Sequence, residues 1–187
     1  MAKYRMMTAL ATVCALAACG SGGDKAGGSA AEKPSEGGGM PANWKATDAC
    51  SILDKAAVAE VLKREVGETS LALVHEPSAT DAATSECTYA GPDGNVASLM
   101  ARWSPINDQT AETITAARST AAAALKAFGK TPEDVPGLGK GAFFAPGIDQ
   151  LTVFIDGARM IVVTAQKVPD GVSGKDATIA LAKKAGA

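Results

Sequence analysis

The stretch that decides the fold is ECTYAGPDGNVASLMARW, residues 86–103. ECTYA and VASLMARW are rich in residues that favour β-structure, and the Pro-Asp-Gly sequence at 92–94 supplies the restricted φ and the glycine that a tight turn needs. Cys87 and Tyr89 lie two positions apart, so they share one face of the first strand. The stretch predicts a β-hairpin, and a hairpin requires antiparallel pairing.

The regions on either side of this hairpin have helix and strand patterns of their own. Upstream, Ser51 and Asp54 resemble a capping box before apolar residues at helical spacing, and Gly67 is a suitable residue to end the helix. Downstream, the alanine run at 121–124 predicts a thin helix that can pack close to a sheet. The expected elements are helices at about 52–66, 107–128 and 173–184, and strands at 69–75, 86–90, 96–103, 141–145, 150–156 and 158–165.

The order of these expected elements is α-β-β-β-α-β-β-β-α. A helix followed by three strands occurs twice, which predicts two helix-plus-meander units, although the two halves share no convincing sequence identity. Helices must cover one or both faces of an antiparallel sheet. We predict an α+β fold, with residues 44–187 as a single domain that is long enough to bury a core.

The first 18 residues have the pattern of a signal peptide. Lys3 and Arg5 supply a positive start, and an apolar run follows at residues 6–17. This run is shorter than the roughly 20 residues that a helix needs to span a bilayer. No other segment of the sequence is apolar for long enough to span one. We therefore predict that residues 1–18 are a signal peptide that is removed.

The apolar run ends in Leu16-Ala17-Ala18-Cys19, which resembles a bacterial lipobox. The resemblance implies that Cys19 carries a diacylglycerol on its sulfur, that cleavage occurs just before it, and that the new amine is acylated. The alternatives are an ordinary signal peptide that ends at this cysteine, or a buried core cysteine. Residues 20–43 are rich in Gly, Ser, Ala and Pro, so we predict that residues 19–43 are a lipidated cysteine and a flexible tether.

The lipobox and the charge together predict location and partners. Gly20 stands where Asp commonly signals inner-membrane retention in enteric bacteria, so we expect the periplasmic face of the outer membrane in a Gram-negative host and the outer face of the plasma membrane otherwise. Loss of Lys3 and Arg5 leaves 16 of 18 basic residues against 20 acidic ones, a net charge of −4. This charge excludes a nucleic-acid surface. The expected partner is the membrane, through the lipid on Cys19.

The cysteine count indicates a crosslink. Cys14 lies in the signal peptide and Cys19 is the lipid site, which leaves Cys50 and Cys87 as an even pair in an oxidising compartment. We predict that they form a disulfide. Two buried free thiols are the alternative. A metal site is a weaker alternative, because the sequence has no CxxC motif and only one histidine.

Three short motifs resemble a known family. CSIL at 50–53 opens a helix, ECTY at 86–89 carries the second cysteine, and PGLGKGA at 136–142 precedes paired strands. Together they resemble a family of uncharacterised bacterial lipoproteins best known from actinobacteria, over most of residues 48–185. The sequence departs from the family pattern at Ala49, Tyr89 and Lys140, where Pro, Trp and Asp are usual. The family has no established activity, and the resemblance implies a lipoprotein domain with a Cys50–Cys87 bridge.

Several residues are of types that serve in catalysis or binding, but none is predicted to be catalytic, to bind a metal or to bind a cofactor. The glycines at 137–141 follow a helix and lead into a strand, which is the wrong context for a phosphate loop. His75, with Glu76 and Asp81 near it, is interpreted as a surface residue because it ends a strand beside a polar loop. A hydrolytic triad is unsupported, since no GxSxG motif accompanies this single histidine. Solvated faces explain the other nearby carboxylates, and core or rim packing explains the two tryptophans. These residues are Glu68, Glu86, Trp44 and Trp103.

The leading functional hypothesis is a membrane-anchored lipoprotein of the cell envelope that acts as a non-catalytic binding or interaction module. The alternatives are a cell-envelope hydrolase, or an inhibitor or protective lipoprotein that blocks a hydrolase with an exposed loop such as 76–86 or 130–140. A structure discriminates among them. A closed surface favours a protein partner, a cavity favours a ligand, and a deep polar pocket that gathers His75 with carboxylates favours an enzyme.

Overall fold

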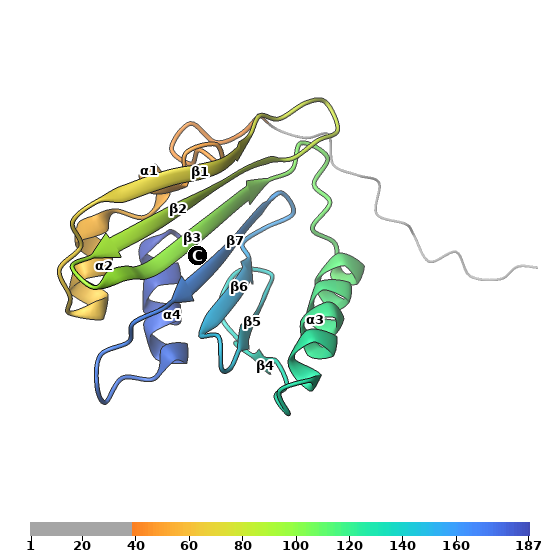
Figure 1. The fold of residues 1–187 in the computed structure, drawn as a ribbon. Coiled ribbons are helices and arrows are strands. Elements are labelled where there is room, and N and C mark those ends of the chain that lie inside the picture. The colour runs from red at the N-terminus through yellow and green to blue at the C-terminus, as the bar shows by residue number, and fades with distance from the viewer. Residues whose placement is uncertain (1–38) are drawn as a thin grey trace, which may run out of the picture. The chain divides into compact units, whose positions relative to one another are not determined.

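The structure is a computed structural model that describes residues 39–187, and Figure 1 shows its elements. Cys19, the lipobox and the predicted signal peptide lie outside the described residues. Within 39–187 the structure has four helices and seven strands. The elements are α1 (Ala49–Ile52), α2 (Lys55–Leu62), β1 (Thr69–His75), β2 (Ala83–Gly91), β3 (Gly94–Trp103), α3 (Ala111–Lys126), β4 (Glu133–Asp134), β5 (Gly141–Ala145), β6 (Gln150–Phe154), β7 (Arg159–Ala165) and α4 (Gly174–Lys184).

The seven strands form one antiparallel sheet with the order β1-β2-β3-β7-β6-β5-β4. The predicted hairpin is confirmed as β2 and β3, with Cys87 opposite Leu99. β3 also pairs with β7, where Leu99 lies opposite Val163, so this pairing joins the strands before α3 to those after it. The predicted α+β class is therefore confirmed: the described residues form one seven-stranded antiparallel sheet and four helices.

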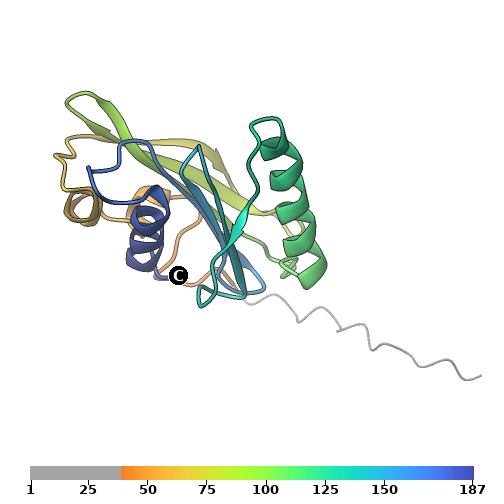
Figure 2. The ribbon, with the colours of Figure 1, turned by 90° about the horizontal axis from the view of Figure 1, so that it is seen from below.

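One face of the sheet, which we call the inner face, carries the hydrophobic core. Alternate residues of the central strands point to this face and are fully buried. α4 packs on it against β6 and β7, α1 packs on β2, and α2 packs beside α4. Figure 2 shows α2 and α4 on the same side of the sheet and α3 on the opposite side. The inner-face residues include Cys87, Tyr89, Leu99, Ala101, Leu151, Val153, Ile161 and Val163.

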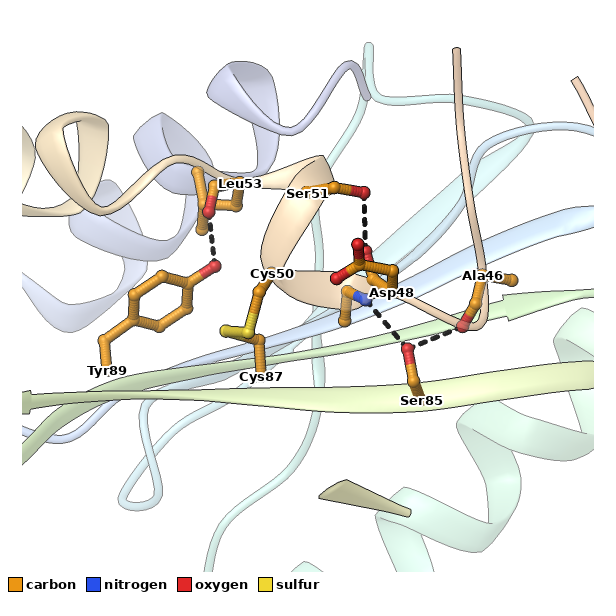
Figure 3. Close-up of a disulfide and its surroundings, with 9 residues drawn as sticks. Ala46, Asp48, Cys50, Ser51, Leu53, Ser85, Cys87 and Tyr89 are labelled. Atoms are coloured by element: carbon orange, nitrogen blue, oxygen red, sulfur yellow. Dashed lines mark hydrogen bonds between the residues drawn. A yellow bond between two sulfur atoms is a disulfide. The ribbon is translucent and has the colours of Figure 1, made fainter. Parts of the chain in front are cut away.

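A disulfide between Cys50 and Cys87 ties α1 to the inner face, as the sequence predicted (Figure 3). The two Cα atoms are 5.0 Å apart across a sequence separation of 37 residues. On one side of it, the Ser85 hydroxyl donates to the carbonyl of Ala46 at 2.6 Å and accepts from the amide of Ala49 at 2.8 Å. These contacts satisfy backbone groups where the chain enters α1.

On the other side of the disulfide, the Tyr89 hydroxyl binds the backbone just after α1 (Figure 3). It is fully buried and donates to the Leu53 carbonyl at 2.5 Å. Burial raises the pKa of Tyr89, and the nearby carboxylates of Asp54 and Asp48 raise it further. The phenol therefore stays neutral and serves as a donor at physiological pH.

The first predicted helix is wrong in its extent. We expected one helix over 52–66, but the chain forms α1 and α2 with a break at Leu53, whose backbone is extended. Asp54 caps α2 by accepting from the Ala56 amide at 2.6 Å, so this aspartate begins a second helix and is not the third residue of a capping box. α2 ends at Leu62, and the residue that follows, Lys63, has the left-handed conformation, so the helix stops before the predicted Gly67.

Other elements differ from prediction mainly at their ends. β2 begins three residues earlier than expected, and the two-residue β4 was not predicted. The long helix is Ala111–Lys126, so Phe128 lies beyond it and is exposed. Ser173 caps α4 by accepting from Asp176, as its position predicted. No helix among residues 39–187 is long and apolar enough to cross a membrane.

The first strand, β1, is an edge strand that stays exposed along its whole length. Its register with β2 shifts between Ala72 and His75, and Leu73 has a φ of 52° and is 71% exposed. A bulge of this kind twists an edge strand and breaks up the row of unpaired N–H and C=O groups on which another strand could pair. His75, at the end of β1, is therefore a surface residue in the structure.

Candidate functional site

Among residues 39–187, α3 is the helix that covers the second face of the sheet, the outer face (Figure 2). A groove lined by residues of α3 and of the sheet lies between them. Its volume is about 590 Å³, which is within the range of small-molecule sites. The α3 residues that line it extend from Thr113 to Leu125, or about 18 Å at the rise of an α-helix. The groove therefore follows most of the helix and is large enough for an elongated small molecule.

The groove exists because α3 packs loosely on the sheet. Of its 16 residues only Leu125 is buried. The side chains turned to the groove are mostly small, among them Ala117, Ala121 and Ala124. We expected the alanine run to bring the helix close to the sheet, but the alanines border the groove instead. Small side chains leave space between helix and sheet when other contacts hold the helix away.

The contacts that hold α3 lie at its ends and edge. Thr110 caps the helix by accepting from the Thr113 amide. Arg118 pairs with Asp134 of β4 at 2.6 Å and also donates to the Pro132 carbonyl. Ile114 lies over Gly141, where a side chain on the glycine would be only 3.2 Å from it. These contacts fix the height of α3 above the sheet.

The floor of the groove is a set of apolar residues on the outer face. One row of directly opposed residues crosses three strands, from Arg102 to Met160 to Phe154. The next row contains Val162, Thr152 and Phe143. The rings of Phe143 and Phe154 are 6.5 Å apart and tilted by 41°. Apart from Arg102, Gln150 and Thr152, this floor offers an apolar surface to a ligand.

The end of the groove near the start of α3 is polar. The guanidinium of Arg102 binds both carboxylate oxygens of Asp108, at 2.9 and 2.5 Å. Hydrogen bonding from Arg102 holds the pKa of Asp108 below its ordinary value against the opposing effect of partial burial. The Gln109 side-chain amide donates to Asp108 at 3.1 Å, and its backbone amide donates to Gly157. Arg102 and Asp108 therefore neutralise each other inside the site.

A second hollow, of about 240 Å³, lies at the opposite end of β2 and β3. It is lined by Lys63, Arg64, Glu65, Pro92, Asp93, Val96 and Lys167. Its charges have both signs, and the Lys167 ammonium group donates to the Asp93 carbonyl. Lys63, Arg64 and Glu65 are exposed. Because solvated side chains of mixed sign define it, this hollow is a weaker candidate than the groove.

The residues weighed from sequence do not gather at the groove. His75 and Glu76 lie at the exposed end of β1, and Asp81 bonds to Ser78 in the following loop. Trp44 and Trp103 are buried in the core, as predicted. In the glycine loop, Gly139 has a φ of 53° and lies directly against the Phe154 carbonyl, so it has a structural role. Among residues 39–187, no three His, Cys, Asp or Glu side chains are placed to hold a metal.

The groove was missed by sequence reasoning, although one signal was present. GAFFA and QLTVF are apolar at consecutive positions, not at alternate ones. Continuous apolar strands indicate that both faces of a sheet are covered. Ala142 and Phe144 face the core, while Phe143 and Ala145 face the groove. The pattern therefore pointed to a cover over this part of the outer face.

Comparisons of the chain with protein-family models, with curated proteins and with solved structures give no match. The resemblance to actinobacterial lipoproteins stays a prediction from the three motifs.

Proposed function

We propose that this protein is a lipid-anchored lipoprotein of the cell envelope, and that its domain binds a single-chain amphiphile in the groove under α3. The observation that carries the proposal is a groove of about 590 Å³ whose floor and helical roof are largely apolar. Burial of an alkyl chain there is favourable by about 0.8 kcal/mol for each CH₂ group. The polar end at Arg102 and Asp108 would face the head of the ligand.

The chemistry of the lining supports binding in preference to catalysis. The two charged side chains of the lining, Arg102 and Asp108, are paired with each other, so neither is poised to act as an acid or a base. Among residues 39–187, the lining contains no serine, cysteine, histidine or lysine, and its hydroxyl groups are those of Thr113, Thr120 and Thr152. A nucleophile with an adjacent base is the usual requirement for hydrolysis.

The shape of the site supports a small molecule in preference to a folded protein. The site is a groove roofed by a helix, so a slender ligand reaches its floor more readily than a broad protein surface does. The proposed anchor at Cys19 and the proposed tether at 19–43 would keep the groove close to a membrane, where amphiphiles are abundant. An extended apolar peptide is the main competing occupant, and a binding panel distinguishes the two.

The test is a fluorescence titration with the hydrophobic probe N-phenyl-1-naphthylamine, followed by its displacement with ten-carbon amphiphiles below their micelle concentration. A chain that begins at residue 20 suits the experiment, since it keeps every core residue and lacks the signal peptide and the lipid site. We expect saturable probe binding and displacement by the amphiphiles. Displacement by an apolar decapeptide alone would favour the peptide and contradict the proposal.

Two alanines of α3 provide a matched pair of variants. Ala121 lines the groove, whereas Ala123 is exposed on the same helix and does not line it. We expect Ala121→Trp to fill the groove and weaken probe binding by about tenfold or more. Ala123→Trp should leave binding within about twofold of the original. Equal binding by the two variants would place the probe elsewhere and overturn the proposed site.

A further inference from the structure

Gln109 contributes a buried hydrogen-bond acceptor to the polar end of the groove. Its side chain is part of the groove lining, and the residue is only 2% exposed. The side-chain nitrogen donates to Asp108 at 3.1 Å, but the side-chain oxygen has no hydrogen-bond partner among the described residues. An unpaired buried acceptor is unfavourable, because it has lost its bonds to water without replacement.

The orientation of this amide follows from its neighbour. A carboxylate only accepts hydrogen bonds, so the side-chain nitrogen of Gln109 must face Asp108 and the oxygen must face away. Turning the amide over would place its oxygen against the Asp108 carboxylate, which is repulsive. The group without a partner is therefore an acceptor, and only a donor can satisfy it.

The charges nearby restrict the ligand head further. Arg102 is engaged by both oxygens of Asp108, so this end of the groove has little net charge to attract an anion. A carboxylate head would also meet the Gln109 oxygen as a second acceptor and would leave it unpaired. A carboxylate head is therefore disfavoured, and an uncharged head with an N–H or O–H group is favoured.

We propose that Gln109 is a specificity residue of the groove, and that it selects amphiphiles whose head is an uncharged hydrogen-bond donor such as a primary amide or a hydroxyl. This inference rests on the proposed function, because it assumes that a ligand occupies the groove. The Gln109 oxygen is itself covered, so its pairing with a ligand donor requires neighbouring side chains to move aside while its amide nitrogen stays on Asp108. The alkyl chain then lies over Met160 and Phe154 beneath α3.

The test compares three probes with the same ten-carbon skeleton, each as a competitor of N-phenyl-1-naphthylamine. Decanamide carries a donor, methyl decanoate carries only acceptors, and decanoate is an anion. We expect decanamide to bind about fivefold more tightly than methyl decanoate, and decanoate to bind most weakly. Equal affinity for decanamide and methyl decanoate, or a preference for decanoate, would overturn the inference.

Variants at two glutamines assign the preference to one residue. Gln109→Met keeps the length of the side chain and removes the acceptor, so it should abolish the preference for decanamide over methyl decanoate. Gln150 also lines the groove, but its amide already bonds to Thr164 at 3.2 Å. Gln150→Met should change the affinity for both probes together and keep their ratio. Loss of the preference in Gln150→Met but not in Gln109→Met would contradict the assignment.

The outcomes separate this inference from the proposed function. If none of the three probes displaces N-phenyl-1-naphthylamine, the proposed function itself fails. If all three displace it with equal strength, the groove binds amphiphiles and only the role of Gln109 fails. If Gln109→Met does not fold, as judged by its circular dichroism, the ranking of the three probes on the unaltered chain still decides the head-group preference.

Discussion

The helix on the inner face of the sheet packs more closely than the helix on the outer face. On the inner face, α4 buries four of its 11 residues: Ala177, Thr178, Leu181 and Ala182. On the outer face, α3 buries one of its 16 residues, Leu125. Both helices are capped by a hydroxyl residue, so the difference lies in the packing and not in helix formation. The inner face carries the closely packed core, and the outer face keeps an open groove.

This difference follows from the side chains that each helix turns to the sheet. Leu181 of α4 fills the space above the central strands, whereas Ala117 and Ala121 of α3 leave space above Met160 and Val162. A close-packed interior cannot admit a ligand without displacing atoms. Because the packed core and the groove lie on opposite faces, the groove leaves the packing of the core intact.

Removal of the disulfide should have the largest effect, because it loosens the inner face. We expect the double variant Cys50→Ser/Cys87→Ser to lose about 3–4 kcal/mol of unfolding free energy, since the bridge closes a loop of 37 residues. Urea unfolding monitored by tryptophan fluorescence measures the loss. Reductant should lower the stability of the original chain similarly and leave the double variant unchanged. Equal stability with and without the bridge would contradict the expectation.

Adjacent residues of β3 provide a direct comparison of the two faces. Leu99 is fully buried on the inner face, and Met100 is half-buried on the outer face. Leu99→Ala should cost about 3 kcal/mol through lost burial and a cavity. Met100→Ala should cost about 1 kcal/mol or less, because its neighbours are not closely packed. Equilibrium unfolding of each variant measures its loss of unfolding free energy. Equal losses in the two variants would refute the difference in packing between the two faces.

Tyr89→Phe tests the buried hydrogen bond beside the disulfide. The variant keeps the ring and leaves the Leu53 carbonyl without its donor, which should cost about 1–2 kcal/mol. The same urea titration measures this loss. Phenylalanine at 89 should not weaken probe binding in the groove, since the ring faces the other side of the sheet. A loss of probe affinity in folded protein would contradict the separation of the two faces.

Acid should remove the stabilisation that the Arg102–Asp108 pair contributes, and this loss of unfolding free energy should be smaller than the losses above. The pKa of Asp108 is lowered in the folded chain, so its pairing with Arg102 stabilises the fold at pH values above the ordinary Asp range. That contribution should be lost as pH falls below about 4 and the carboxylate takes up a proton. We expect the stability advantage of the original chain over Asp108→Asn to shrink between pH 5 and pH 2.5 on urea unfolding. If the unfolding free energies of the two proteins fell in parallel with pH, this expectation would be contradicted.

The hairpin was predictable because only one of its faces is fully buried. Along β3 the inner-face residues are buried and the outer-face residues are half-exposed, which produces a period of two in the sequence. The break between α1 and α2 was not predictable from the pattern, because Ser51 and Asp54 fit a capping box as well as they fit two separate turns. β4 has two residues, which is too short for any periodicity.

The groove was only partly predictable. The helical spacing of residues 114–125 indicated a helix, and the continuous apolar residues of β5 indicated that both faces of that strand are covered. Neither pattern shows how close the helix lies to the sheet. That distance depends on contacts such as Arg118 with Asp134, and on Ile114 over Gly141, which join residues far apart in the chain.

The sequence by itself determined the α+β class, the central hairpin and the cysteine pair, because each of these depends on local patterns or on a count. Lipid attachment at Cys19 stays a prediction from the sequence. The tertiary structure alone decided that α3 covers the outer face loosely and that Gln109 is buried beside Asp108. The physical reason is that a groove and an unpaired acceptor are properties of packing between distant segments. Local sequence carries no record of the space that such packing leaves.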